Sequence, residues 1–332
     1  MYLIHRKELC SMNTENKMSS KQKQKLCIVV MAILVIAIFA CLVTIVCLSA
    51  DFSANDDDST ETGEQSSGNA SLEVLKDTQT YKASLNESLA GSLVVVNSNH
   101  AYNLPSTELN LLLVSTYRNE NKTEESVPYK INGISSLKLD KATLENLHVM
   151  LTDLKKATGR NDTMISTGYK SDVMDEYSTG KLVALKAYDA NGVETYLNEE
   201  INADIESWLV KNAYKYGFIQ RYPEGKESIT GVSNYTHCYR YVGVEHATYI
   251  KNNNLCLEEY VEMLERDKPS IENPLVIKAS TGTYAVYYYE SNGSSTDVQI
   301  PKTNPTPAGT EKNPYTVSAT NYGGIIVTVK VK

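Results

Sequence analysis

The side chains best suited to binding a metal lie near the middle of the chain. Cys238 can supply a thiolate ligand, His237 is its neighbour, and Asp189 lies upstream. A catalytic zinc site needs three protein ligands and a fourth position open to water. Successive residues of a strand point to opposite faces, so His237 and Cys238 cannot easily serve one metal. Asp189 opens an Asp-Ala-Asn-Gly run that is typical of a hairpin turn. The pattern therefore favours a surface histidine, a buried thiol and a turn aspartate over a metal site.

Nucleophilic catalysis by a serine triad has no support in the sequence. No Gly-x-Ser-x-Gly motif occurs. The histidines outside the central stretch have no recognisable nucleophile as a partner, and they are His5, His100, His148 and His246. We therefore expect His246, which follows Glu245 after the second central strand, to be structural.

A helix and two strands are predicted to position the central residues. An apolar face recurs at helical spacing through Ile201, Ile205, Trp208, Leu209, Ala213 and Tyr216. Gly217 stands where a left-handed C-terminal cap belongs. The run Phe218–Tyr222 predicts a short buried strand broken at Pro223, and Cys238–Val242 predicts a second strand. The loop between them would lie over the two strand ends, a common place for a site.

This stretch resembles the closing half of the VanY-type zinc D-alanyl-D-alanine carboxypeptidases. Residues 229–246 align without a gap to the family pattern ITGxxYEPWHFRYVGxEH. The residues that match are Ile229, Thr230, Gly231, Arg240, Tyr241, Val242, Gly243, Glu245 and His246. The resemblance implies that the chain has the fold of this family.

The resemblance also implies a zinc site, but its residues are replaced in this chain. The family takes two ligands from a run similar to SEHxTGLAVDLKxYD, which aligns with residues 175–189. Tyr177 stands at the ligand histidine and Ala184 at the ligand aspartate. Cys238 stands at the third ligand, a histidine, and Tyr235 at the general-base glutamate. The implied protein is a degenerate member with neither a catalytic residue nor a metal.

A substrate-binding position is retained in altered form. The family motif SGYRS corresponds to Thr167-Gly-Tyr-Lys-Ser171, and its basic residue helps to hold the substrate carboxylate. Lys170 keeps the charge but lacks the bidentate fork of arginine. The resemblance therefore implies that Lys170 and Ser171 bind substrate.

The first 71 residues divide into three segments by charge and hydropathy. Residues 1–25 are polar and basic, residues 26–50 are apolar and uncharged, and residues 51–71 are acidic and rich in serine. The apolar run can span a hydrocarbon core of about 30 Å. We predict a cytoplasmic tail, a single transmembrane helix in the cell membrane and a disordered linker, with the remaining chain extracytoplasmic. A cleaved signal peptide is the alternative, although its apolar region is normally shorter.

The rest of the chain is predicted to hold a carboxypeptidase-like domain, residues 72–268, and a C-terminal β-module, residues 269–332. In the domain, apolar runs predict strands at Ser92–Asn97, Leu109–Ser115 and Met164–Thr167. Helices are predicted from Asp140, as the N-cap, to Gly159, and over Glu258–Glu265. In the module, strand-like runs cover Leu275–Lys278, Tyr284–Tyr289, Val298–Ile300, Tyr315–Ser318 and Ile325–Lys330.

These elements predict an α+β fold with a small antiparallel sheet and flanking helices, as in the zinc D,D-carboxypeptidases. The transmembrane helix and the β-module are additions to that fold. Outside the cytoplasm, Cys238 and Cys256 form a disulfide in one alternative, although the surroundings of Cys256 resemble a helix start of the family and favour an incidental thiol.

The expected function is that of a membrane-anchored, carboxypeptidase-like protein of the bacterial envelope. The replaced positions favour a non-catalytic protein that binds peptidoglycan stem peptide or an envelope partner. The alternative is an active D-Ala-D-Ala metallo-carboxypeptidase with an unorthodox zinc site. A net charge of −8 disfavours a nucleic-acid partner.

Overall fold

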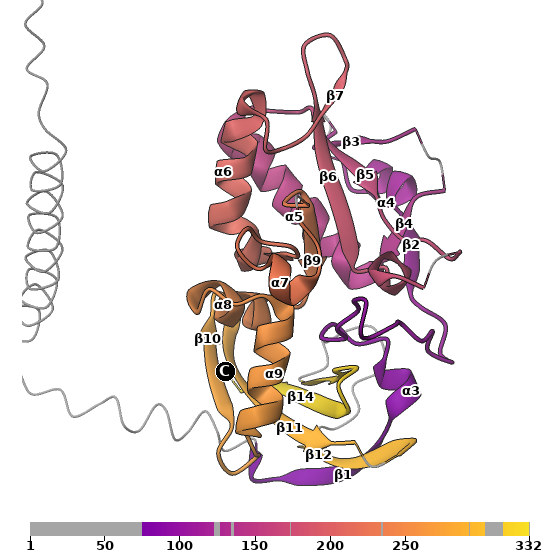
Figure 1. Ribbon diagram of the computed structural model, residues 1–332, viewed down its shortest axis with the longest axis vertical. Coiled ribbons are helices and arrows are strands. Elements are labelled where there is room, and N and C mark those ends of the chain that lie inside the picture. Colours follow the sequence, from indigo (N-terminus) through magenta and orange to yellow (C-terminus); the bar gives the residue numbers. More distant parts are fainter. Residues whose placement is uncertain are drawn as a thin grey trace, which may run out of the picture. The chain divides into compact units, whose positions relative to one another are not determined.

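A computed structural model gives the fold of the chain after its N-terminal segments (Figure 1). It describes residues 75–122, 127–133, 136–172, 174–233, 235–291, 293–302 and 315–331. The predicted cytoplasmic tail, transmembrane helix 26–50 and linker 51–71 lie outside these ranges. Within them, no helix combines the length and the apolar character that crossing a membrane requires.

The central sheet is built from short strands in the order β3-β5-β6-β9-β8, with β7 also paired to β6. All its pairs are antiparallel except the parallel pair β3–β5. The strand bounds are Lys130–Ile131 for β3, Thr163–Thr167 for β5, Leu182–Tyr188 for β6, Glu194–Thr195 for β7, Phe218–Gln220 for β8 and Cys238–Tyr241 for β9. The predicted strands at Met164, Phe218 and Cys238 are thus confirmed.

Helix α5 (Lys141–Thr158) begins and ends where the sequence predicts. The Asp140 side chain accepts a hydrogen bond from the Thr143 amide at the N-terminus, and Gly159 adopts φ 74° at the C-terminus. Its apolar face packs against the sheet beside α6 (Ala203–Asn212), as Figure 1 shows. The core of this layer includes Leu144, Leu147, Leu151, Leu154, Val183, Leu185, Leu209 and Tyr239.

A glycine in the left-handed conformation links the helical segment that includes α6 to strand β8. The 3-10 helix η3 (Glu200–Asn202) precedes α6, and η4 (Ala213–Tyr216) follows it and leads to Gly217 at φ 85°. A Cβ atom at Gly217 would lie 2.6 Å from a ring carbon of Tyr241, so only glycine fits both the conformation and the space. Ile201, predicted on the apolar face, is 54% exposed because α6 begins only at Ala203.

The predicted strand Ser92–Asn97 is not a strand. Its side chains are buried as expected, but the segment pairs with no neighbouring strand. Instead, the carbonyls of Ser92 and Val94 accept hydrogen bonds from Arg240, and that of Val96 accepts one from Arg221. Arginine side chains therefore satisfy main-chain groups that a sheet ladder would otherwise satisfy.

The segment Leu109–Ser115 is also shorter as a strand than predicted. β2 covers only Leu111–Leu113 and pairs with β4 (Lys138–Asp140), after which α4 (Val114–Glu120) begins. Two further short helices are α3 (Leu85–Ser88) and α7 (Glu227–Thr230), the latter in the loop between β8 and β9.

The five strands predicted for the C-terminal β-module are confirmed, and four of them form an antiparallel sheet. A four-stranded antiparallel sheet has the order β10-β11-β14-β13, and β12 pairs with the N-terminal strand β1 (Thr78–Ser84). The bounds are Leu275–Ala279 for β10, Gly282–Glu290 for β11, Ser295–Pro301 for β12, Tyr315–Ala319 for β13 and Gly324–Lys330 for β14. The module thus takes one strand from the beginning of the described chain.

Two helices connect the central sheet to the module (Figure 1). α8 (Val244–Asn252) and α9 (Leu257–Asp267) share an apolar core with residues of β10, β11 and β14. His246 of α8 is buried in contact with α9 and β14. Its Nδ1 lies 2.8 Å from the Tyr260 hydroxyl, and its Nε2 lies 3.0 Å from the Thr328 hydroxyl. Burial lowers its pKa to about 3, so the imidazole is neutral and structural, as predicted.

Candidate functional site

The structure brings together three of the four positions that the sequence predicts to be replaced. Ala184 of β6 and Cys238 of β9 are register partners across the sheet. Tyr177 lies on η2 (Glu176–Thr179), and its ring packs with them and with Tyr222. Sequence positions 61 residues apart thus meet, as the resemblance requires.

A hydrogen bond joins two of these side chains. The Tyr177 hydroxyl lies 3.6 Å from Cys238 Sγ. Burial, and then the neighbouring Cys238, raise the pKa of Tyr177 far above its ordinary value. Burial raises the pKa of Cys238 to about 11. Both groups are therefore protonated at neutral pH, and a neutral thiol is a poor metal ligand.

Zinc, which the resemblance implies, does not fit these residues. Ala184 has no donor atom, and Tyr177 and Cys238 would each have to lose a proton that burial holds in place. In the ranges given above, no three His, Cys, Asp or Glu side chains gather so that they could hold a metal ion. The donor set falls short of the three ligands that a catalytic zinc needs.

The alternative ligands lie apart from Cys238. Asp189 accepts hydrogen bonds from the amides of Asn191 and Val193 in the β6–β7 hairpin, as its turn motif predicts. His237 stacks on Tyr235, with ring centroids 5.4 Å apart. Cys238 and Cys256 are free thiols, so the disulfide alternative is not formed.

Tyr235 stands at the rim rather than at the replaced centre. It is 50% exposed, and its ring meets the edge of Tyr222 at a centroid distance of 6.4 Å. A phenol lacks the pair of acceptor oxygens with which an ionised carboxylate takes a proton. The residue that aligns with the general-base glutamate is thus a half-exposed tyrosine.

Lys170 lies beside the replaced centre. It follows β5, and its Nζ lies 4.5 Å from the centroid of the Tyr177 ring. The side chain is exposed, as is the adjacent Ser171. A cation over an aromatic face is held by the ring quadrupole. The structure therefore places the exposed positive charge of Lys170 beside the Tyr177–Cys238 cluster.

Beneath this cluster is a buried ion network that the sequence analysis missed. Glu176, one residue before Tyr177, accepts hydrogen bonds from Arg221 Nε at 2.7 Å and from Arg240 Nη1. Arg221 also pairs with Glu258 of α9 at 2.6 Å. Burial acts to lower the pKa of Arg221. The carboxylates of Glu176 and Glu258 outweigh this effect, so the pKa lies above its ordinary value. Charges that are almost fully buried need such pairing.

The network connects separate parts of the chain. Glu176 belongs to η2, Arg221 follows β8, Arg240 lies on β9 and Glu258 lies on α9. The two arginines also donate hydrogen bonds to main-chain carbonyls in residues 92–96. The sequence signal that could have revealed this network is a charged residue inside an apolar run, such as Arg240 between two tyrosines. Sequence alone did not show which charges pair. The network fixes η2, and with it the position of Tyr177.

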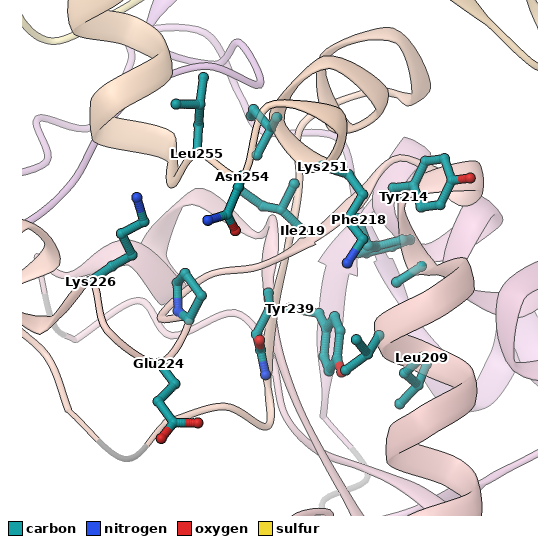
Figure 2. Close-up of a pocket in the computed structure, with 15 residues that line it drawn as sticks. Leu209, Tyr214, Phe218, Ile219, Glu224, Lys226, Tyr239, Lys251, Asn254 and Leu255 are labelled. Carbon is teal, nitrogen blue, oxygen red and sulfur yellow. The ribbon is translucent and has the colours of Figure 1, made fainter. Parts of the chain in front are cut away.

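Figure 2 shows a separate pocket of about 160 Å³ at the outer edge of β8. Its lining includes Leu209, Phe218, Tyr239, Lys251 and Leu255. Tyr239 faces this pocket whereas its neighbour Cys238 faces the Tyr177 cluster, since successive strand residues point to opposite faces. The pocket and the replaced centre therefore lie on different sides of β9.

The arrangement of sheet and helices matches that of a solved structure. The crystal structure of the vancomycin-resistance D,D-dipeptidase VanXYg, in complex with a D-Ala-D-Ala phosphinate analogue, matches with a TM-score of 0.58. The match covers 76% of this chain and 99% of that chain, at 19% sequence identity. It shows the α+β fold of the VanX/VanY carboxypeptidases, to which this chain adds the C-terminal antiparallel sheet.

Sequence comparisons give the family. The model of the VanY family, D-alanyl-D-alanine carboxypeptidase, matches residues 103–244. A D-alanyl-D-alanine carboxypeptidase of Enterococcus faecium is 28% identical over 255 residues, which cover 72% of this chain and 75% of the relative. One from Enterococcus faecalis is 49% identical over 73 residues, 22% of this chain and 25% of the relative. Residues 103–244 of the chain therefore belong to the VanY family of D-alanyl-D-alanine carboxypeptidases.

Proposed function

We propose that this member of the family is a non-catalytic protein of the bacterial envelope that binds peptidoglycan stem peptides ending in D-Ala-D-Ala. The observation that carries the proposal is the Tyr177–Cys238 hydrogen bond beside Ala184. By the family alignment these residues stand at zinc-ligand positions, and burial raises the pKa of both side chains.

Hydrolysis by the family's mechanism lacks its parts in this chain. It needs a metal-activated water and a carboxylate that accepts the proton of that water. The cluster offers a phenol, a methyl group and a protonated thiol, and Tyr235 replaces the carboxylate. Peptide binding does not depend on these parts, because a carboxylate ligand needs only a positive charge in a fixed place.

Lys170 supports the binding role. Its ammonium group lies over Tyr177 and remains accessible, so it can pair with the terminal carboxylate of a peptide. The Glu176–Arg221 ion pair holds the 3-10 helix that carries Tyr177, and so fixes the ring beside which the Lys170 ammonium lies. A D-Ala-D-Ala analogue is bound in the structural relative VanXYg, and the curated relatives are named as carboxypeptidases of this dipeptide.

The proposal places the domain outside the cell membrane. Its support is the uncharged run 26–50 between a basic segment and the acidic residues that follow. The peptide ligand fits this location because stem peptides lie in the wall. Ser171, exposed beside Lys170, is the second residue proposed to contact the peptide.

Calorimetric titration of the full-length chain with a pentapeptide ending in D-Ala-D-Ala tests the binding role. We expect weak binding that Lys170→Ala reduces about tenfold, through the loss of a charge-assisted hydrogen bond. Lys251→Ala, which removes a positive charge at the separate pocket, is the matched control and should bind like the wild type. Equal affinity in the Lys170 variant would exclude Lys170 from the site, and absence of binding would favour an envelope protein as the partner.

A further inference from the structure

Three aromatic rings form a row at the surface near the Tyr177–Cys238 cluster. Tyr196 follows β7, whereas His237 and Tyr235 precede and lead into β9. The ring centroids of Tyr196 and His237 are 5.3 Å apart, and those of His237 and Tyr235 are 5.4 Å apart. The outer rings are 49% and 50% exposed. The row therefore offers the half-exposed rings of Tyr196 and Tyr235 to a ligand, with the ring of His237 between them.

The polar groups at the edge of the row carry balanced charges. Lys186 Nζ lies 5.0 Å from the centroid of the Tyr196 ring and pairs with Glu194 at 3.0 Å. The pair offers hydrogen-bond donors and acceptors to a ligand beside Tyr196 without a net charge. An anionic or cationic ligand would gain little there, whereas a neutral ligand with many hydroxyl groups would find partners of both kinds.

The row reaches the Tyr177–Cys238 cluster through Tyr222. Tyr235 meets the edge of Tyr222, whose ring packs in the Cys238 cluster and whose hydroxyl donates to Glu176 at 3.3 Å. A ligand could therefore extend from the replaced centre across Tyr235 and His237 to Tyr196. This extent suits a chain of several rings better than a single small molecule.

We propose that the row Tyr196–His237–Tyr235 binds the sugar rings of a neutral glycan chain. The C–H faces of pyranose rings stack on the aromatic faces through dispersion contacts, and their hydroxyls bond to Lys186 and Glu194. That this glycan carries the stem peptide bound in the cleft rests on the proposed function, whereas the aromatic site itself does not.

Titration of the full-length chain with the β-1,4-linked tetramer of N-acetylglucosamine tests the inference. The tetramer carries no peptide and no charge, so it reports on the aromatic row alone. We expect the wild type to bind it, and Tyr196→Ala and Tyr235→Ala each to weaken binding about tenfold. Tyr196→Phe and Tyr235→Phe keep the rings and should bind within about threefold of the wild type.

Tyr81→Ala is the matched control, because Tyr81 is 39% exposed on β1 of the module. Its affinity for the tetramer should be that of the wild type. Unchanged melting temperatures of the alanine variants would exclude misfolding as the cause of weak binding. No binding by the wild type, or equal binding by both alanine variants, overturns the inference.

The peptide and sugar titrations separate this inference from the proposed function. Tetramer binding without pentapeptide binding would contradict the proposed function and leave the glycan site standing. Pentapeptide binding without tetramer binding would overturn the glycan site and leave the proposed function standing.

Discussion

The hydroxyl of Tyr177 lies 3.6 Å from the Sγ of Cys238, within a cluster that also holds Ala184. In the VanY family, zinc would join the elements that carry these residues. Here a neutral hydrogen bond and apolar contacts join them, and the Glu176–Arg221 ion pair supports them from below. These contacts join η2, β6 and β9 at the positions that align with the family's zinc ligands.

Cys238 should be unreactive in the folded chain. A pKa raised by burial from 9.0 to about 11 lowers the thiolate fraction at neutral pH about 100-fold, and the side chain is 1% exposed. Timed alkylation at pH 7.5 with peptide mapping should show slow labelling of Cys238, and rapid labelling after unfolding in denaturant. Labelling of the native thiol at the rate of a free cysteine would contradict the burial of this site.

The same shift predicts a loss of stability at alkaline pH. A thiol whose folded pKa exceeds its unfolded pKa stabilises the fold below about pH 9, and this contribution disappears as pH rises towards about 11. The loss amounts to at most roughly 3 kcal/mol. Denaturant unfolding between pH 8 and 11 should show a shallower decline for Cys238→Ala than for the wild type, since buried tyrosines titrate in both. Equally steep declines in the unfolding free energy of the two proteins would contradict a raised pKa of Cys238.

Residues with local signals were predicted well from sequence, and those with distant partners were not. Asp140 and Gly159 delimit α5 because capping depends on neighbouring residues. The burial of the apolar run in Ser92–Asn97 was predicted, but the predicted strand was wrong, because its carbonyls bind arginines more than a hundred residues away. The pairing of β1 with β12 has no local signature either. In the site, motif alignment brought Tyr177 to Cys238, whereas the network around Glu176 required coordinates.

The buried network predicts unequal effects for two acidic residues of α9. Glu258→Gln leaves Arg221 with one charged partner fewer in a buried place, and should cost about 3 kcal/mol of unfolding free energy. Asp267 forms an exposed pair with Arg266, so Asp267→Asn should leave the unfolding midpoint nearly unchanged. Guanidinium titrations of both variants make the comparison. Equal midpoints would show that the network contributes nothing to stability.

The N-terminal segments predict an uncleaved membrane anchor. Protease added to intact cells should cut within residues 51–71, because an acidic, serine-rich segment offers accessible backbone. The products would be a released domain and a short fragment that stays with the membrane. Recovery of a soluble chain that begins near Asp51 would instead indicate a cleaved signal peptide.

The central claim is that this family member has lost its metal centre, and zinc content tests it most directly. The variant Tyr177→His/Ala184→Asp/Cys238→His restores the family's ligand types at the three positions and is the matched comparison. Elemental analysis after purification in zinc-containing buffer should find almost no zinc in the wild type and about one ion per chain in the variant. Stoichiometric zinc in the wild type, removed by chelator with a lowered melting temperature, would contradict the claim.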